Sequence, residues 1–158
     1  MNARYFPTRI VSGGQTGVDQ AALTVAIDLG LEHGGWCPKG RRCESGTIPA
    51  HFLLSPMPTS SYAARTRQNV IDSDATLILH RGALTGGTLL TSTIAQDLGR
   101  PLLLLDLAGR VDEGLVRQWL ESETVATLNI AGPRESTCPG IYQDSCDALQ
   151  SILRHGVR

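Results

Sequence analysis

The sequence has few of the features that mark metal-binding and disulfide-rich proteins. It holds four cysteines, Cys37, Cys43, Cys138 and Cys146, and none of them form a Cys-x-x-Cys pair. A zinc ribbon is therefore not expected, and a chain of 158 residues needs no disulfide bonds to be stable. We expect reduced thiols, a cytoplasmic protein, and no metal held tightly by protein side chains.

Aromatic residues, net charge and long apolar runs are also scarce. Aromatic residues make up 4% of the chain, and the formal net charge is -1. A nearly neutral protein is not expected to bind nucleic acid through bulk charge. The longest leucine run, Leu102 to Leu105, is far too short to cross a bilayer, so no membrane association is expected.

Two common nucleotide-binding fingerprints are missing as well. The segment 13–17 reads Gly-Gly-Gln-Thr-Gly, which is not the dinucleotide pattern Gly-x-Gly-x-x-Gly. No Gly-Lys-Ser/Thr sequence follows it, so an ATP-hydrolysing P-loop is not expected.

Glycine, in contrast, is abundant, with 17 residues in the chain. A predicted buried strand over 8–12 runs into Gly13 and Gly14, and then through Gly17 into a predicted helix over 17–29. Glycines let backbone N–H groups approach a ligand, and a helix start adds unpaired donors and a positive dipole end. This turn therefore predicts the binding of an oxyanion, above all a phosphate.

Strands and helices alternate along the rest of the chain. Further helices are predicted over 60–71, 86–98, 110–122 and 139–154. Further strands are predicted near 35–37 and over 51–55, 75–80, 101–106 and 125–130. The alternation predicts a single Rossmann-like α/β domain over residues 1–158, with a doubly wound, mainly parallel sheet and helices on both faces.

Two of these segments have a distinctive pattern. The strand over 101–106 is a continuous apolar run, which is typical of a strand buried on both faces. The helix over 60–71 has a polar face, made of Tyr62, Arg65, Thr66 and Asn69.

Three glycine turns are expected at one edge of this sheet, over 13–17, 82–88 and 132–140. Ligands bind outside the carboxyl ends of parallel strands, so these turns should form the ligand site. The expected contacts are Gly13, Gly14, Gln15, Thr16, Gly17, Thr85, Gly86, Gly87, Thr88, Arg134, Glu135 and Ser136. The alternative is that the glycines serve packing alone, as they often do before helices.

Charged residues near these turns are further candidates. Asp19 either compensates the dipole of its helix or contacts the organic part of the ligand. Lys39 and Arg41 belong to a basic loop over 38–49 that is either a positive lid on the ligand or a solvated surface loop. Arg65, Arg81 or Arg134 could join them, and Arg134 is the best candidate for a bidentate phosphate contact.

No catalytic residue can be assigned from the sequence. Cys37 and His80 each end a predicted strand and could face the pocket, but neither has a partner at triad spacing. Asp72 and Asp74 precede a strand at the opposite edge and are expected to be turn residues.

Several of these motifs together resemble the molybdenum (molybdenum cofactor) carrier family. The matching segments are 11–19, 34–41, 72–79, 84–88 and 129–136. The resemblance implies a Rossmann-like fold related to cytokinin-activating phosphoribohydrolases, the lysine decarboxylase-like proteins. It also implies a nucleotide or pterin phosphate ligand, with molybdenum cofactor as a cargo. The phosphoribohydrolases carry a glutamate shortly after the 84–88 motif, whereas Leu89, Leu90 and Thr91 stand here.

Three functions follow as hypotheses. The first is a carrier that binds a phosphorylated small molecule. The second is a nucleotide N-glycosidase or phosphoribohydrolase, for which Asp19, Glu44 and Glu135 are the candidate carboxylates. The third is a regulatory sensor that responds to a nucleotide. A homo-oligomer is expected, a dimer by analogy with related folds.

Overall fold

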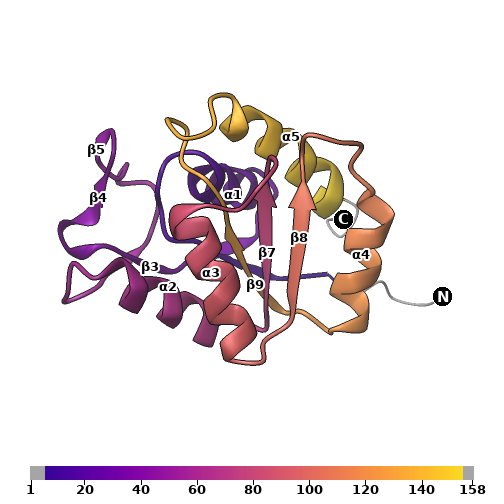
Figure 1. The fold of residues 1–158 in the computed structure, drawn as a ribbon, viewed down its shortest axis with the longest axis horizontal. Helices are drawn as coiled ribbons and strands as arrows, with labels where there is room; N and C mark the ends of the chain where they lie inside the picture. The colour runs from indigo at the N-terminus through magenta and orange to yellow at the C-terminus, as the bar shows by residue number, and fades with distance from the viewer. Residues whose placement is uncertain (1–5, 155–158) are drawn as a thin grey trace.

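A computed structural model describes residues 6–154 (Figure 1). Its centre is a sheet of five parallel strands in the order β2-β1-β9-β7-β8. The strands are β1 (Arg9–Val11), β2 (Glu32–Gly34), β7 (Ala75–His80), β8 (Leu102–Asp106) and β9 (Thr127–Ala131). The last strand, β9, therefore lies in the middle of the sheet, between two strands that precede it in the chain.

Helices cover both faces of this sheet. On one face α1 (Val18–Asp28), α4 (Glu113–Ser122) and α5 (Ile141–Arg154) share the largest hydrophobic core with the sheet. On the other, α2 (Tyr62–Ile71) packs against α3 (Gly86–Asp97), as Figure 1 shows. The predicted Rossmann-like α/β fold is confirmed.

The helices form where apolar residues recur every three or four positions. In α1 the side chains of Val18, Ala22, Val25 and Ala26 are fully buried in the core. Burying a valine of this kind stabilises the fold by about 1.5–3 kcal/mol. The chain then leaves the helix at Gly30, whose φ of 71° falls in the left-handed region that favours glycine.

The prediction that the strand over 101–106 is buried on both faces is wrong. This strand, β8, lies at the edge of the sheet, and Leu104 is 44% exposed. An apolar run shows that a strand is favoured, but strand order depends on pairing with distant segments. The leucine run alone therefore could not reveal the edge.

Three other strands differ from the prediction, one of them β6 (Ser55–Pro56), which was predicted over 51–55. The sheet strand β2 covers Glu32–Gly34, which has no apolar run to signal it. The strand predicted near 35–37 is β3 (Trp36–Cys37), which pairs instead with β6 (Ser55–Pro56) in a small separate sheet.

The segment 38–49, predicted as a loop, contains a small hairpin. After a short 3-10 turn, η1 (Lys39–Arg41), the strands β4 (Arg42–Cys43) and β5 (Gly46–Thr47) pair antiparallel. The segment is anchored at its end by Ile48, which is 1% exposed and packs in a second core cluster. The hairpin extends from the body of the protein beside the 132–140 turn, as Figure 1 shows.

Candidate ligand-binding site

A cavity of about 560 Å³ opens at the carboxyl ends of the central strands. Its size suits a drug-sized or cofactor-sized molecule. It receives residues from all three glycine turns, from α2 and from β9. The lining residues are Gly13, Gln15, Asp19, Tyr62, Arg65, Thr66, Asn69, Thr85, Gly86, Gly87, Thr88, Leu90, Thr91, Asn129, Ala131, Gly132, Pro133, Arg134 and Thr137.

The second turn presents an open helix start to this cavity. Thr85 is the N-cap of α3, and its side chain makes no capping hydrogen bond among the described residues. Gly86, Gly87 and Thr88 form the first helical positions, and all of them line the cavity. The first N–H groups of a helix have no partner within it, so this turn offers donors and a positive dipole end to an anion.

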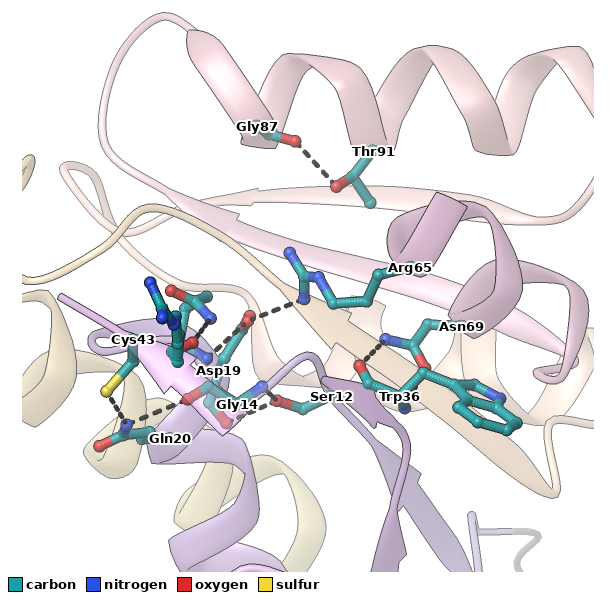
Figure 2. A network of polar contacts seen from close by, with 12 residues as sticks. Ser12, Gly14, Asp19, Gln20, Trp36, Cys43, Arg65, Asn69, Gly87 and Thr91 are labelled. Atoms are coloured by element: carbon teal, nitrogen blue, oxygen red, sulfur yellow. Dashed lines mark hydrogen bonds and ion pairs between the residues drawn. The ribbon is translucent and has the colours of Figure 1, made fainter. Parts of the chain in front are cut away.

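The first turn is different, because a carboxylate of the chain itself occupies it. The Gln15 N–H donates to Oδ2 of Asp19 over 3.2 Å, and the Gly14 N–H donates to the Ser12 hydroxyl over 3.2 Å. Figure 2 shows Ser12, Gly14 and Asp19 below the start of α3. Gly13 and Gln15 line the cavity, whereas Gly14, Thr16 and Gly17 do not.

At Gly13 and at Gly17 another segment of the chain lies close to the backbone. A Cβ on Gly13 would lie 1.4 Å from Nη1 of Arg65. Gly17 has φ 79°, and a Cβ there would lie 2.4 Å from the carbonyl oxygen of Pro133. The packing alternative therefore describes these two positions well, since each glycine lets another segment approach the backbone.

Asp19 and Arg65 form a buried ion pair at the cavity wall. Nη1 of Arg65 lies 3.8 Å from Oδ2 of Asp19, and the two side chains are 11% and 8% exposed. Burial raises the pKa of Asp19 to about 6, although the Arg65 charge and the Gln15 N–H both lower it. The carboxyl group can therefore take up a proton slightly below neutral pH.

The Arg65 guanidinium has hydrogen-bonding capacity left over. Its Nε is buried and has no hydrogen-bond partner among residues 6–154. The guanidinium carbon lies 5.6 Å from the centre of the Tyr62 ring, a cation–π distance. In Figure 2 the guanidinium lies between Asp19 and the first turn of α3. Because Arg65 lines the cavity, its guanidinium offers a positive charge to an anionic ligand there.

The polar face predicted for residues 60–71 proves to be cavity lining. Tyr62, Arg65, Thr66 and Asn69 all contribute to it. Asn69 is held in place because its side chain accepts from the Trp36 N–H over 2.8 Å and donates to the Trp36 carbonyl over 3.0 Å. Among the four, the sequence analysis proposed only Arg65 as a ligand contact.

Asn129 begins the 129–136 segment that carries part of the family resemblance, but it was not predicted as a ligand contact. It lies in β9, is 3% exposed, and donates to the Thr76 hydroxyl over 3.3 Å. A further signal for it was its amide side chain in a largely apolar strand.

The third turn contributes Arg134 and Thr137 to the cavity but uses Glu135 and Ser136 internally. The Glu135 carboxylate accepts from the N–H groups of Gly140 and Tyr142, each over 2.9 Å, at the start of α5. The Ser136 hydroxyl and N–H both donate to Glu44. Glu135 and Ser136 therefore lie outside the lining.

The basic residues of the 38–49 segment are not brought to the cavity either. Lys39 is exposed and Arg41 is not part of the lining. The Arg41 guanidinium instead donates to the carbonyl groups of Leu54, Pro49 and Phe52 over 2.9–3.2 Å. It holds the base of the segment together.

Cys37 and His80 also lie outside the lining. Cys37 is fully buried in the second core cluster, and burial raises the pKa of its thiol. Nδ1 of His80 lies 2.7 Å from the Gly82 carbonyl oxygen. At the opposite edge Asp74 accepts from the N–H groups of Ala126 and Thr127, a structural role like the one expected.

Within residues 6–154, no three or more His, Cys, Asp and Glu side chains gather as a group that could hold a metal ion. In the same range, every helix is too short or too polar to traverse a lipid bilayer.

Comparisons with known proteins agree with this fold. No functionally curated protein matches the chain. A crystal structure named "Putative molybdenum carrier protein", from Syntrophus aciditrophicus SB, is 45% identical, with a TM-score of 0.91 over 94% of this chain and 96% of that one. The resemblance to the molybdenum carrier family is thereby confirmed. The profile of the Circularly permutated YpsA SLOG family matches residues 10–153, and the chain belongs to that family.

Proposed function

We propose that the chain binds a phosphorylated small molecule, a nucleotide or a pterin phosphate, in the cavity between α2 and α3. The observation that carries the proposal is Arg65, a buried guanidinium with a spare Nε that shares the cavity with the open start of α3. A guanidinium and a helix start are two of the strongest phosphate-binding groups in proteins.

Different parts of the cavity suit the phosphate and the heterocycle of such a ligand. The phosphate binds at Gly86, Gly87 and Thr88, with Arg65 and Arg134 as counter-charges. The heterocycle lies toward Asn129 and Asp19, whose amide and carboxyl groups are suited to ring nitrogens and exocyclic amines.

A carrier of molybdenum cofactor is the form of this function that the similar protein's name suggests. The cofactor would be cargo held through its pterin phosphate, since the cavity offers donors for a phosphate.

Calorimetry tests the proposal with a panel of AMP, GMP, a pterin phosphate and molybdenum cofactor. We expect at least one member to bind, and Arg65→Ala to weaken it about 10–100-fold, the range for a lost charged hydrogen bond. Arg65→Lys keeps the charge but loses the planar guanidinium. Its affinity for the ligand should lie between those of the wild type and Arg65→Ala. Arg67→Ala is the matched control, because Arg67 is exposed on the same helix. If no panel member binds, the proposal fails.

The position and the raised pKa of Asp19 support a second candidate function, that of a nucleotide N-glycosidase. Its carboxyl group lines the cavity, and a pKa of about 6 suits proton transfer near neutral pH. Glu44 and Glu135, the other carboxylates considered, are outside the lining. Release of free base from the nucleotides of the panel, lost in Asp19→Asn while binding persists, would support this enzyme. Binding without base release would favour the carrier.

A further inference from the structure

The tip of the β4–β5 hairpin is fastened to the third glycine turn through Glu44. Its carboxylate accepts hydrogen bonds from the hydroxyls of Thr16 and Ser136 and from the Ser136 N–H, the last over 3.1 Å. Nη1 of Arg134 lies 3.9 Å from the same carboxylate. These contacts lower the pKa of Glu44, with the Ser136 hydroxyl as the largest cause, so the group is ionised at neutral pH.

The donors around Glu44 form a set that suits a free oxyanion equally well. Two hydroxyls, one backbone N–H and a guanidinium converge from two separate turns, and each can donate to phosphate as to carboxylate. The Thr16 hydroxyl also accepts from the Glu135 N–H over 3.2 Å. That bond orients the hydroxyl so that its proton points to the anion.

This donor set adjoins the main cavity. Arg134 belongs to both, since it lines the cavity and lies beside Glu44. A ligand bound in the cavity can therefore extend a second anionic group past Arg134 toward Thr16 and Ser136.

The hairpin is built so that its tip can move while its base stays fixed. The base is held by Arg41 on the carbonyl groups of residues 49, 52 and 54, and by the buried Ile48. Ser45, at the tip, is exposed, and the Glu44 side chain is 21% exposed. Displacing the Glu44 carboxylate therefore need not disturb the core.

We propose that Thr16, Arg134 and Ser136 form a second anion subsite, which the Glu44 carboxylate fills in this structure and a phosphate-class group of the ligand takes over by displacing it. The inference rests on the proposed function, because the subsite extends the same cavity. It implies a ligand with two anionic groups, such as a nucleoside diphosphate or its derivative.

Inorganic phosphate is the probe that tests the subsite. Its affinity is measured by NMR titration at constant ionic strength for the wild-type chain and Glu44→Ala. We expect phosphate to bind Glu44→Ala at least about tenfold more tightly, because the competing carboxylate is gone. Adding Ser136→Ala to that variant should remove the gain. Glu121→Ala, which deletes an exposed carboxylate on α4, should behave as wild type.

Two further variants keep the outcome decisive. Glu44→Gln removes the charge but keeps the side-chain size, and serves if Glu44→Ala does not fold. Adding Gly87→Asp to the Glu44 variant blocks the start of α3. If phosphate still binds more tightly than to the wild type, the gain in affinity arises at the subsite and not at the main phosphate site. Equal phosphate affinity in wild type and both Glu44 variants would overturn the inference. The main site would then still stand or fall by the calorimetric panel.

Discussion

The two glycine turns that follow β1 and β7 look alike in sequence but differ in what they offer a ligand. In the turn at 13–17 an N–H group already donates to the carboxylate of Asp19. In the turn at 85–88 the first N–H groups of α3 face the cavity with no side chain capping them among residues 6–154. The N–H groups of a glycine-rich turn are therefore free for a ligand only where no acceptor of the chain is already bound to them.

The largest expected effect concerns the packing of the first turn, at Gly17. Gly17→Ala should lower the free energy of unfolding by about 4 kcal/mol, because the new Cβ meets the Pro133 carbonyl and the φ of 79° disfavours a side chain. Gly30→Ala is the control, since its φ is 71° but no atom lies within 4 Å of the new Cβ. It should cost only about 1 kcal/mol. Equal losses in urea denaturation would contradict the packing role of Gly17.

The second prediction converts the open turn into a filled one. Gly87→Asp places a carboxylate at the start of α3, as Asp19 does at the first turn, and should weaken the best ligand of the panel about 100-fold or more. Folding should be retained, because there is open space beside Gly87 and an acid favours this end of a helix. Gly87→Asn is the neutral control. If calorimetry finds the two variants equally affected, charge at the α3 start is not what matters.

The third prediction concerns the acid that fills the first turn. The folded-state pKa of Asp19, about 6, exceeds the ordinary 3.8, so the folded protein binds this proton more tightly than the unfolded chain. Its contribution to stability is therefore greatest below pH 3.8 and is lost as the pH rises through 6. Asp19→Asn removes this dependence. The stability difference between wild type and variant should change by about 2 kcal/mol between pH 4.5 and 7.

Urea denaturation of both proteins across that range measures the change. The free energy of unfolding of the wild type should rise relative to that of the variant as the pH falls. A difference that stays constant with pH would mean that Asp19 keeps an ordinary pKa despite its burial.

The smallest expected effect concerns the third turn, where the Glu135 carboxylate accepts from backbone N–H groups of the chain itself. Glu135→Ala removes the acceptor for the N–H groups of Gly140 and Tyr142 and should destabilise the protein by about 1 kcal/mol. Glu123→Ala, an exposed acid after α4, should be nearly neutral. Thermal melts of the two variants show whether Glu135 stabilises the start of α5 as a cap. Unchanged stability with weakened ligand binding would show that Glu135 acts as a ligand contact instead.

Much of the fold could be predicted from the sequence because its signals are local. The apolar run Ala75–His80 is a strand with the predicted bounds, and the periodic face of residues 17–29 is buried as expected. What the sequence could not show depends on distant partners. The strand at Glu32–Gly34 exists through its pairing with β1, and the exposure of Leu104 follows from strand order.

The cavity opens at the sheet edge where the glycine turns were predicted to meet, and residues 85–88 all line it. Their contact with a ligand stays a prediction. The sequence could not show that Glu44 reaches Ser136, 92 positions away, or that Arg41 binds nearby carbonyl groups. Such contacts decide which donors remain for a ligand, and they arise only in the folded chain.

We expect an oxyanion to bind at the start of α3 and not at the backbone N–H groups of Gly14 and Gln15, which already donate to acceptors of the chain. An NMR titration of the wild-type chain with inorganic phosphate tests it through the backbone amide signals. We expect the largest shifts at Gly86, Gly87 and Thr88, with Gly14 and Gln15 little changed. Shifts centred on residues 13–17, with 86–88 unmoved, would contradict it.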